Sequence, residues 1–268
     1  MSIFCSFNTP IREWRGKTAW IIGASSGIGR AVAVALLDAG AHVAVSARDQ
    51  DALETLATGY PHGRVTVLPL DVNDMEALAA AHARLVQIAA IDLLLYCAGY
   101  YKGLRAFVLD REEMLRHQQV NYVGAINVLA AVLPTLQARG AGHVSLVASV
   151  AGYRGLPMCA AYGPTKAALT HLAEAMYIDL HPLGIDVSVI QPGFVETPLT
   201  DDNEFRMPAL IKPTEAATAM LDGWSRGAFE IHFPKRFTWI VKFMRLLPYR
   251  LYFPLIRKLE RMYLPAAK

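Results

Sequence analysis

The chain has 268 residues, of which 54% are hydrophobic and only 18% charged, and its formal net charge is +3. This apolar content excludes a disordered chain, and three cysteines without a CxxC spacing exclude a small disulfide-stapled fold. The first 15 residues lack a signal-peptide pattern, and no run of 18 uncharged apolar residues predicts a spanning helix, so we expect a cytoplasmic protein.

Short apolar runs alternate with helix-like stretches along most of the chain. The runs that we expect to be strands are Thr18–Ile22, His42–Ala47, Val65–Leu70, Leu93–Tyr96, His143–Ala148 and Asp186–Ile190. The clearest helical stretches between them are Ile28–Ala39, Met75–Ala89, Val120–Arg139 and Ala160–His181. The runs lack polar alternation, which is typical of strands covered on both faces. The order predicts an α/β fold, with one doubly wound parallel sheet of the Rossmann type in three layers.

The first expected strand runs into a glycine-rich turn and then a helix. The turn contains Gly23, Ser25, Ser26, Gly27, Ile28 and Gly29. Glycines let the backbone approach a phosphate closely, and the new helix presents free N–H groups and the positive end of its dipole to that phosphate. Any tight strand-to-helix turn can contain glycine, but this context favours dinucleotide binding.

The ends of the next two strands bear on the choice of cofactor. A basic residue after the second strand accommodates a 2′-phosphate, whereas an acid there favours NAD. Arg48 occupies the nearest position, Arg30 is a second candidate cation, and Asp49 follows immediately. We therefore favour NADP(H), with NAD(H) and an ordinary surface arginine as the alternatives. Asp71, followed by Val72, ends the third strand and is either an adenine ligand or the N-cap of the next helix.

The fourth and fifth strands end in residues suited to the reacting end of a cofactor. Small side chains at Cys97, Ala98 and Gly99 would let the cofactor pass across the sheet edge. Ser149 follows the fifth strand, and Tyr162 and Lys166 lie four residues apart on one helical face. A phenol titrates near pH 10, and a nearby ammonium favours its ionised form, so this pair suits proton transfer. A buried tyrosine beside a lysine that only packs is the alternative.

Taken together, these motifs resemble the short-chain dehydrogenase/reductase family, in its single-domain form of about 250 residues. The resemblance runs from about Lys17 to about Ile231. The matching motifs, in order, are Gly23-x-x-x-Gly27-Ile28-Gly29, Asp71, Cys97-Ala98-Gly99, Asn121, Ser149, Tyr162-x-x-x-Lys166 and Pro192-Gly193. Ile22 and Cys97 depart from the family, which usually has threonine and asparagine at these positions.

The resemblance implies a role for each matching residue. Tyr162 would be the acid/base, Lys166 would hold the nicotinamide ribose and lower the tyrosine pKa, and Ser149 would bond the substrate oxygen. Asn121 would kink its helix and anchor a water in a proton relay. The segment containing Pro192, Gly193, Val195 and Thr197 would bind the nicotinamide carboxamide. No metal site is expected.

Substrate recognition should come from the segments beyond the strand ends. These are a lid at about 197–213, the loop with Tyr153 and Leu156–Met158, and the loop with Tyr100, Tyr101 and Leu104. Their apolar side chains predict either a lipophilic pocket or ordinary core and interface packing.

The segment 235–268 departs from the rest of the chain in charge. It contains nine basic residues and a single acid, a charge of +8, while the remainder has a charge of −5. Pro248 and Pro254 divide it into short helical pieces rich in large apolar residues. Such a segment binds an anionic bilayer, or packs on the body or on a second subunit of a homo-oligomer. Nucleic acid is disfavoured because no recognition motif accompanies the charge.

The chain is therefore interpreted as an N-terminal extension (1–16), a catalytic domain (17–234) and a basic amphipathic extension (235–268). We expect an NADP(H)-dependent oxidoreductase that interconverts a ketone and a secondary alcohol on a lipophilic substrate. The alternatives are an NAD-dependent alcohol dehydrogenase of small substrates and a catalytically silent NADP-binding lipid or scaffold protein.

Overall fold

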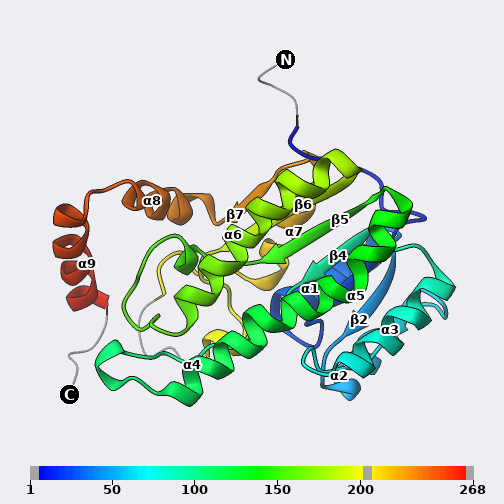
Figure 1. Ribbon diagram of the computed structural model, residues 1–268, viewed down its shortest axis with the longest axis horizontal. Helices are drawn as coiled ribbons and strands as arrows, with labels where there is room; N and C mark the ends of the chain where they lie inside the picture. The colour runs from blue at the N-terminus through cyan, green and yellow to red at the C-terminus, as the bar shows by residue number, and fades with distance from the viewer. Residues whose placement is uncertain (1–5, 202–206, 264–268) are drawn as a thin grey trace.

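A computed structural model describes residues 6–201 and 207–263 (Figure 1). Within these residues, seven strands form one sheet in the order β3-β2-β1-β4-β5-β6-β7, and every neighbouring pair is parallel. The strands are β1 (Thr18–Ile22), β2 (His42–Ser46), β3 (Val65–Val67), β4 (Leu93–Tyr96), β5 (Gly142–Val147), β6 (Ile185–Pro192) and β7 (Glu230–Phe233).

Helices cover both faces of this sheet. One face carries α1 (Gly27–Asp38), α2 (Gln50–Ala57) and α7 (Pro213–Ser225), and the other carries α3 (Met75–Ile88), α5 (Gly124–Arg139) and α6 (Tyr162–Leu180). A short α4 (Arg111–Gln118) and a π-helical turn, η2 (Gln119–Val123), lead directly into α5. The three-layer Rossmann-type fold expected from the sequence is confirmed.

The core lies in two layers, one on each side of the sheet. Its strand residues are nearly all buried, as a parallel sheet between helices requires. Trp20 and Trp224 are fully buried on opposite faces, and each indole N–H donates to a buried serine hydroxyl, Ser46 or Ser145, at 2.9 Å. These bonds matter because a buried indole N–H without an acceptor would be costly.

Some predicted boundaries differ from the structure. The third strand is shorter than expected and ends at Val67 rather than Leu70. Leu68 and Leu70 still donate to the backbone of the second strand and its end. The predicted helix Val120–Arg139 begins earlier, at Arg111. By length and composition this stretch, 111–139, could cross a bilayer, but Val128 and Val132 pack in the core.

The strand order places a cleft at one edge of the sheet. Strand β1 lies between β2 and β4, so the chain leaves the two central strands in opposite directions. Ligands in open α/β sheets bind at such a switch point, beyond the carboxyl ends of the strands. The loops after β1, β4, β5 and β6 all meet there.

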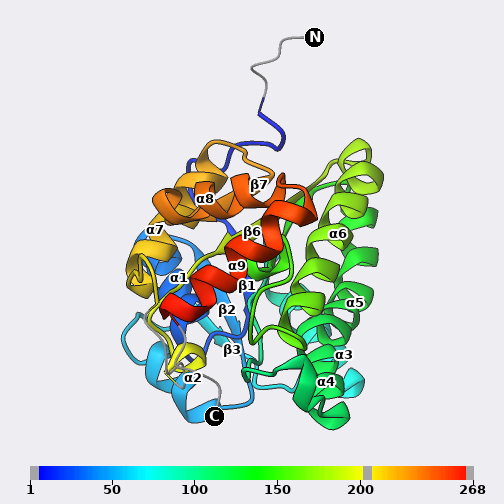
Figure 2. The same cartoon turned by 90° about the vertical axis from the view of Figure 1, so that its left-hand side faces the viewer.

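Both terminal segments are attached to this body. Ile11 and Trp14 pack into the core, the latter with its ring 5.8 Å from Trp224. The C-terminal segment forms α8 (Lys235–Arg245) and α9 (Tyr249–Tyr263), and Figure 2 shows α9 crossing in front of the sheet. Pro248 separates the two helices as predicted. The predicted break at Pro254 is wrong: this proline lies inside α9, at the cost of one backbone hydrogen bond.

Candidate active site

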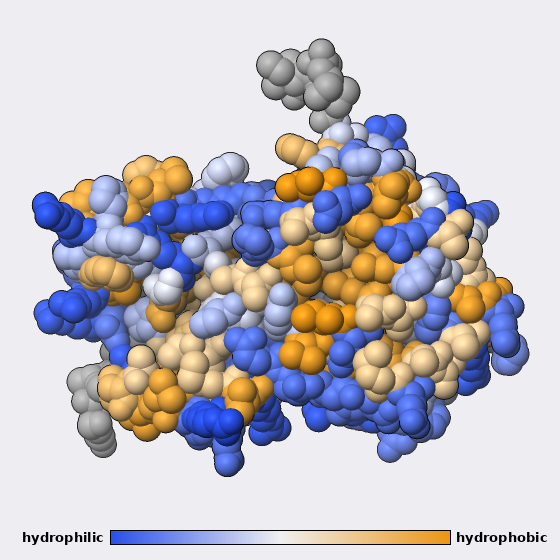
Figure 3. Space-filling view, in the orientation of Figure 1, coloured by the Kyte–Doolittle hydropathy of each residue, from blue (hydrophilic) through white to orange (hydrophobic). Residues whose placement is uncertain are grey.

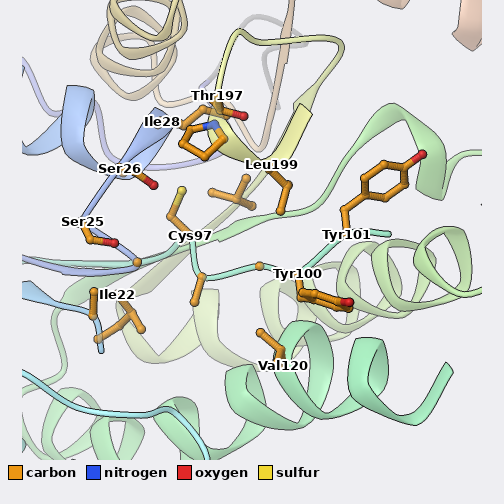
Figure 4. A pocket seen from close by; sticks show the side chains of 18 of the residues that line it. Ile22, Ser25, Ser26, Ile28, Cys97, Tyr100, Tyr101, Val120, Thr197 and Leu199 are labelled. Atoms are coloured by element: carbon orange, nitrogen blue, oxygen red, sulfur yellow. The ribbon is translucent and has the colours of Figure 1, made fainter. Parts of the chain in front are cut away.

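A cleft of about 550 Å³ opens at the switch point. Every residue assigned from the sequence to cofactor binding lines it, and so does Ser149: Gly23, Ser25, Ser26, Gly27, Ile28, Gly29, Arg48, Asp71, Val72, Cys97, Ala98, Gly99, Tyr162, Lys166, Pro192, Gly193, Val195 and Thr197. In Figure 4, Ser25 and Ser26 lie at one end and Tyr100 and Tyr101 at the other, with Cys97, Thr197 and Leu199 between them. Asn121 is buried outside the lining.

The glycine-rich turn is compact enough to form a phosphate cradle. Gly23 has φ +95°, and a Cβ there would lie 2.5 Å from the backbone nitrogen of Ala98. A Cβ on Gly29 would lie 2.0 Å from the carbonyl oxygen of Gly23. Only glycine fits both positions, and the turn leaves the first N–H groups of α1 facing the cleft. This cradle fits the pyrophosphate of a dinucleotide.

Both charged residues that follow β2, Arg48 and Asp49, line the cleft. The Asp49 carboxylate caps α2 by accepting from the backbone of Ala52 at 3.0 Å. Arg48 is exposed at the rim of the cleft. Arg30 donates to the carbonyl oxygen of Ala52 at 3.0 Å and does not line the cleft. The cation at the nucleotide end is therefore Arg48.

Asp71 is not the N-cap of the following helix. That cap is Asp74, which accepts from Glu76 and Ala77, while Asp71 accepts from the backbone of Asn73 at 2.9 Å. The alternative interpretation of Asp71 as a cap is wrong. Its carboxylate lies at the cleft, where an adenine amino group could donate to it.

Ser149, Tyr162 and Lys166 meet at the other end of the cleft. Ser149 lies two residues after β5, and its hydroxyl accepts from the backbone of Ala151 at 3.1 Å and hydrogen-bonds Tyr162. The Lys166 ammonium lies 5.5 Å from the Tyr162 ring centre and donates to the carbonyl oxygen of Val147 at 2.8 Å. One strand end and one turn of α6 thus hold all three side chains.

Burial shifts the pKa of both groups on α6. It raises the pKa of Tyr162, with the Cys159 thiol adding to the rise and the Ser149 hydrogen bond opposing it. Burial also lowers the pKa of Lys166 to about 8, because the cation is costly away from water. Lys166 is therefore a cation that titrates close to neutral pH. The expectation that Lys166 lowers the pKa of Tyr162 is not met: the ammonium lies 5.5 Å from the ring centre, and burial raises the tyrosine pKa instead.

Asn121 lies behind the cleft in the π-helical turn. Its amide accepts from the backbone N–H of Tyr100 at 2.6 Å, donates to the Tyr100 carbonyl at 2.9 Å and donates to Thr165 at 3.1 Å. It thereby fixes the loop after β4 to the α6 turn that carries Tyr162. The sequence-based expectation that Asn121 distorts its helix agrees with the i to i+5 bonding at this point.

The segment after β6, residues 193–200, forms part of the cleft lining. Gly193 donates to the carbonyl of Phe233 at 2.7 Å, and Thr200 donates to the carbonyl of Val195 at 2.9 Å. The Thr197 side chain lies against Gly27, where a Cβ would be 2.9 Å from its methyl group. Residues 202–206 of the predicted lid lie outside the described residues.

Ile22 and Cys97, the two residues that depart from the family motif, have structural roles here and take no part in the reaction. Cys97 donates its backbone N–H to the Ile22 carbonyl at 2.8 Å, so the sheet edge stays bonded. Burial raises the pKa of the Cys97 thiol to about 11, so it stays protonated at neutral pH. Ile22 is buried in the core.

Apolar side chains surround the reacting end. The Tyr101 ring lies edge-on to Tyr162 at 5.0 Å, and Leu199 also lines the cleft. Leu104 donates to the Met158 carbonyl at 2.9 Å, which joins the loops after β4 and β5. Val120 also lines the cleft and had no motif that could identify it, whereas the lining residues Pro198 and Thr200 fall in the predicted lid. In the described residues, no group of three His, Cys, Asp or Glu side chains could hold a metal ion.

Comparisons with known proteins agree with this geometry. Residues 17–206 match the model of the short chain dehydrogenase family. An oxidoreductase of Myxococcus xanthus is 35% identical over 251 residues, which cover 92% of this chain and 99% of that protein. A short chain dehydrogenase of Burkholderia cenocepacia, solved with NADP, is 27% identical with a TM-score of 0.77, covering 87% of this chain and 94% of that one. A 3-ketoacyl-(acyl-carrier-protein) reductase of Brucella melitensis, solved with NADH, is 26% identical with a TM-score of 0.74, covering 82% and 98%.

Proposed function

Because this chain belongs to the short-chain dehydrogenase/reductase family and is an NAD(P)-dependent oxidoreductase, we propose that it interconverts a ketone and a secondary alcohol. The observation that carries the proposal is the meeting of Ser149, Tyr162 and Lys166 at one end of a cleft whose other end is a phosphate cradle. NADP(H) is the favoured cofactor, and NAD(H) is the second choice.

Each of the three side chains has a distinct role in this proposal. The bound nicotinamide supplies or accepts the hydride. Tyr162 gives its phenolic proton to the carbonyl oxygen during reduction, and Ser149 donates a hydrogen bond that stabilises the charge on that oxygen. Lys166 holds the nicotinamide ribose and contributes positive charge beside the phenol. The apolar surroundings exclude water and so strengthen these interactions.

The pKa of Lys166 predicts the alkaline side of the pH–rate profile. Below about pH 8 the ammonium is charged, and above it the charge is lost. Tyr162 remains protonated over that range, because burial raises its pKa. We therefore expect kcat/KM for reduction to fall as the pH rises through about 8. The profile should be measured with wild type and with Lys166→Arg, whose guanidinium stays charged. A fall at the same pH in Lys166→Arg would contradict the assignment to Lys166.

Arg48 is expected to set the preference for NADP(H). A charge-assisted bond to a phosphate is worth about 1.5–3 kcal/mol. Arg48→Ala should therefore lower kcat/KM for NADPH about 10–150-fold and leave kcat/KM for NADH nearly unchanged. The measurement is kcat/KM with each cofactor. Arg30→Ala serves as the control, because its guanidinium bonds the Ala52 carbonyl outside the cleft. An unchanged NADPH preference in Arg48→Ala would remove this role.

A lipophilic substrate suits the reacting end of the cleft. Tyr101, Leu199 and the paired loops at Leu104 and Met158 present apolar surface next to Tyr162. The similarity to a 3-ketoacyl-(acyl-carrier-protein) reductase supports the same view. We therefore place the enzyme in lipid metabolism. An NAD-dependent dehydrogenase of small alcohols is the second candidate, which the exposed position of Asp49 beside Arg48 keeps open.

A homo-oligomer is also part of the proposal. Apolar side chains gather on the exposed surface of α5 and α6, where Ile126 and Ile178 are both exposed, and Figure 3 shows a hydrophobic area over these helices. This surface gives a second subunit a binding site that does not use α8 or α9. We place the protein in the cytoplasm, where its partners are the carbonyl or alcohol substrate and a membrane surface contacted through 235–268.

A further inference from the structure

One arginine of the body, Arg154, contacts both C-terminal helices. Arg154, five residues after Ser149, donates to three carbonyl oxygens at the end of α8, those of Met244, Arg245 and Leu247, at 3.0, 3.2 and 2.5 Å. Its guanidinium also lies 4.5 and 3.9 Å from the ring centres of Tyr249 and Tyr252 in α9. A planar cation that both bonds carbonyls and stacks on rings defines the angle between the helices.

Further polar contacts hold the inner side of the same helices. Tyr252 is buried and donates to the carbonyl of Gly155 at 2.7 Å. Lys242 of α8 pairs with Glu230 of β7, and Glu260 of α9 pairs with Arg105 after β4. The sole acid of the segment is therefore engaged with the body.

The outer side of α8 is apolar and exposed. Trp239, Ile240, Phe243 and Leu246 recur at one-, three- and four-residue intervals, so they share one face, and each is 58–79% exposed. The apolar residues of α8 that face the body are different ones, Phe237, Val241 and Met244. Packing of the segment on its own body therefore leaves these four apolar side chains outside.

The exposed face continues into α9 as a cationic surface with aromatic edges. Tyr249 and Phe253 stack with their ring centres 5.3 Å apart, and both are more than half exposed. The exposed basic residues of the two helices are Lys235, Arg236, Arg245, Arg250, Arg257, Lys258 and Arg261. We call this surface the tail face: the apolar stripe Trp239, Ile240, Phe243 and Leu246, the rings of Tyr249 and Phe253, and these cations.

The charge of the tail face decides between its two candidate occupants. In a two-fold dimer the same patch meets itself, so the exposed cations of α9 would face one another at a cost in repulsion. An anionic bilayer instead attracts each cation, takes up the apolar stripe and accommodates tryptophan and tyrosine at its interface.

The tail face also lies beside the reacting end of the cleft. Arg154 and Gly155 belong to the loop that begins at Ser149, and Arg105 precedes the exposed side chains of Phe107, Val108 and Leu109. Figure 2 shows α8 and α9 on the same side of the molecule as the loops that follow the strands. Because these contacts attach the tail face to the loops after β4 and β5, a ligand bound to the tail face would lie close to those loops.

We propose that the tail face docks on an anionic lipid bilayer and holds the substrate end of the cleft at the membrane surface. Docking itself rests only on the exposed stripe and the cations. The supply of a lipophilic carbonyl or alcohol from that bilayer rests on the proposed function.

Vesicle flotation with the full-length protein tests the docking. Wild type should float with phosphatidylcholine vesicles that contain phosphatidylglycerol, and much less with phosphatidylcholine alone or in high salt. The triple variant Trp239→Ser, Phe243→Ser, Leu246→Ser should lower the floated fraction more than about tenfold.

Replacing Arg250, Arg257 and Lys258 with Gln should lower the partition coefficient on anionic vesicles about 100-fold. A matched triple on α3, Met75→Ser, Val86→Ser, Ile88→Ser, should float like wild type, because these side chains are equally apolar and exposed but lie outside the tail face.

Three outcomes would overturn the proposal. The first is unchanged flotation of the α8 triple variant, and the second is an equal loss in the α3 control. The third is a fall in molar mass by light scattering in the α8 variant without vesicles, which would show that a second copy covers the face. NADPH turnover of a short water-soluble ketone is measured in parallel, so a protein that floats but reduces no carbonyl would refute the proposed function and leave the docking intact.

Discussion

Tyr162→Phe is expected to lower kcat by about 10²–10⁴-fold, the usual contribution of a positioned acid/base, while NADPH binding stays close to wild type. Only the hydroxyl is removed, and the ring can keep its edge-on contact with Tyr101 at 5.0 Å. The measurement combines steady-state kinetics on a ketone with NADPH titration by fluorescence. Cofactor affinity should hold because the phosphate cradle lies at the other end of the cleft.

Tyr60→Phe is the matched control for this result. Tyr60 lies on the surface and donates to Asp38 at 3.0 Å, so loss of its hydroxyl should leave kcat unchanged. A Tyr162→Phe enzyme with wild-type kcat would mean that the proton comes from another group. It would also revive the catalytically silent NADP-binding protein as an interpretation.

Gly23→Ala is expected to lower both the stability of the fold and the affinity for NADPH. The backbone at φ +95° disfavours any side chain, and the new Cβ would lie 2.5 Å from the backbone nitrogen of Ala98. Strain of about 1–3 kcal/mol adds to an overpacking cost of about 1–3 kcal/mol. For a domain of this size that corresponds to a fall in Tm of about 4–20 °C. Differential scanning calorimetry and NADPH titration measure the two effects.

Gly63→Ala separates the backbone strain from the clash. Gly63 also has a positive φ, +83°, but a Cβ there meets no atom within 4 Å. It should lower Tm by the strain alone and leave NADPH affinity unchanged. Equal losses of Tm in the two variants would show that the close approach of Gly23 to the end of β4 contributes nothing.

Much of the fold could be predicted because its signals are local. Apolar runs without alternation marked six of the strands, and the spacing of the glycines marked the turn before α1. Strand β7 and helix α7 had no such signal, although both pack against neighbours in the core. The early end of β3 and the continuation of α9 through Pro254 depend on the surrounding structure, and no local pattern marked either of them.

Some residues of the candidate site could be predicted from local motifs, and others could not. Residues in motifs, such as Tyr162 and Lys166, could be placed on one helical face by counting. The engagement of Arg30 with Ala52 and of Asn121 with Tyr100 depends on contacts between elements distant in sequence. Arg154 carried no motif at all, because its meaning comes from the carbonyls and rings that α8 and α9 bring to it.

The central claim is that this enzyme uses NADPH to reduce a lipophilic carbonyl at Tyr162. Its most direct test is a panel of ketones graded by chain length, assayed first with NADPH and then with NADH. We expect that NADPH is oxidised, that kcat/KM rises with chain length, and that NADH supports lower rates on the same substrates. Faster turnover of the shortest substrates with NADH, or no turnover with either cofactor, would contradict it.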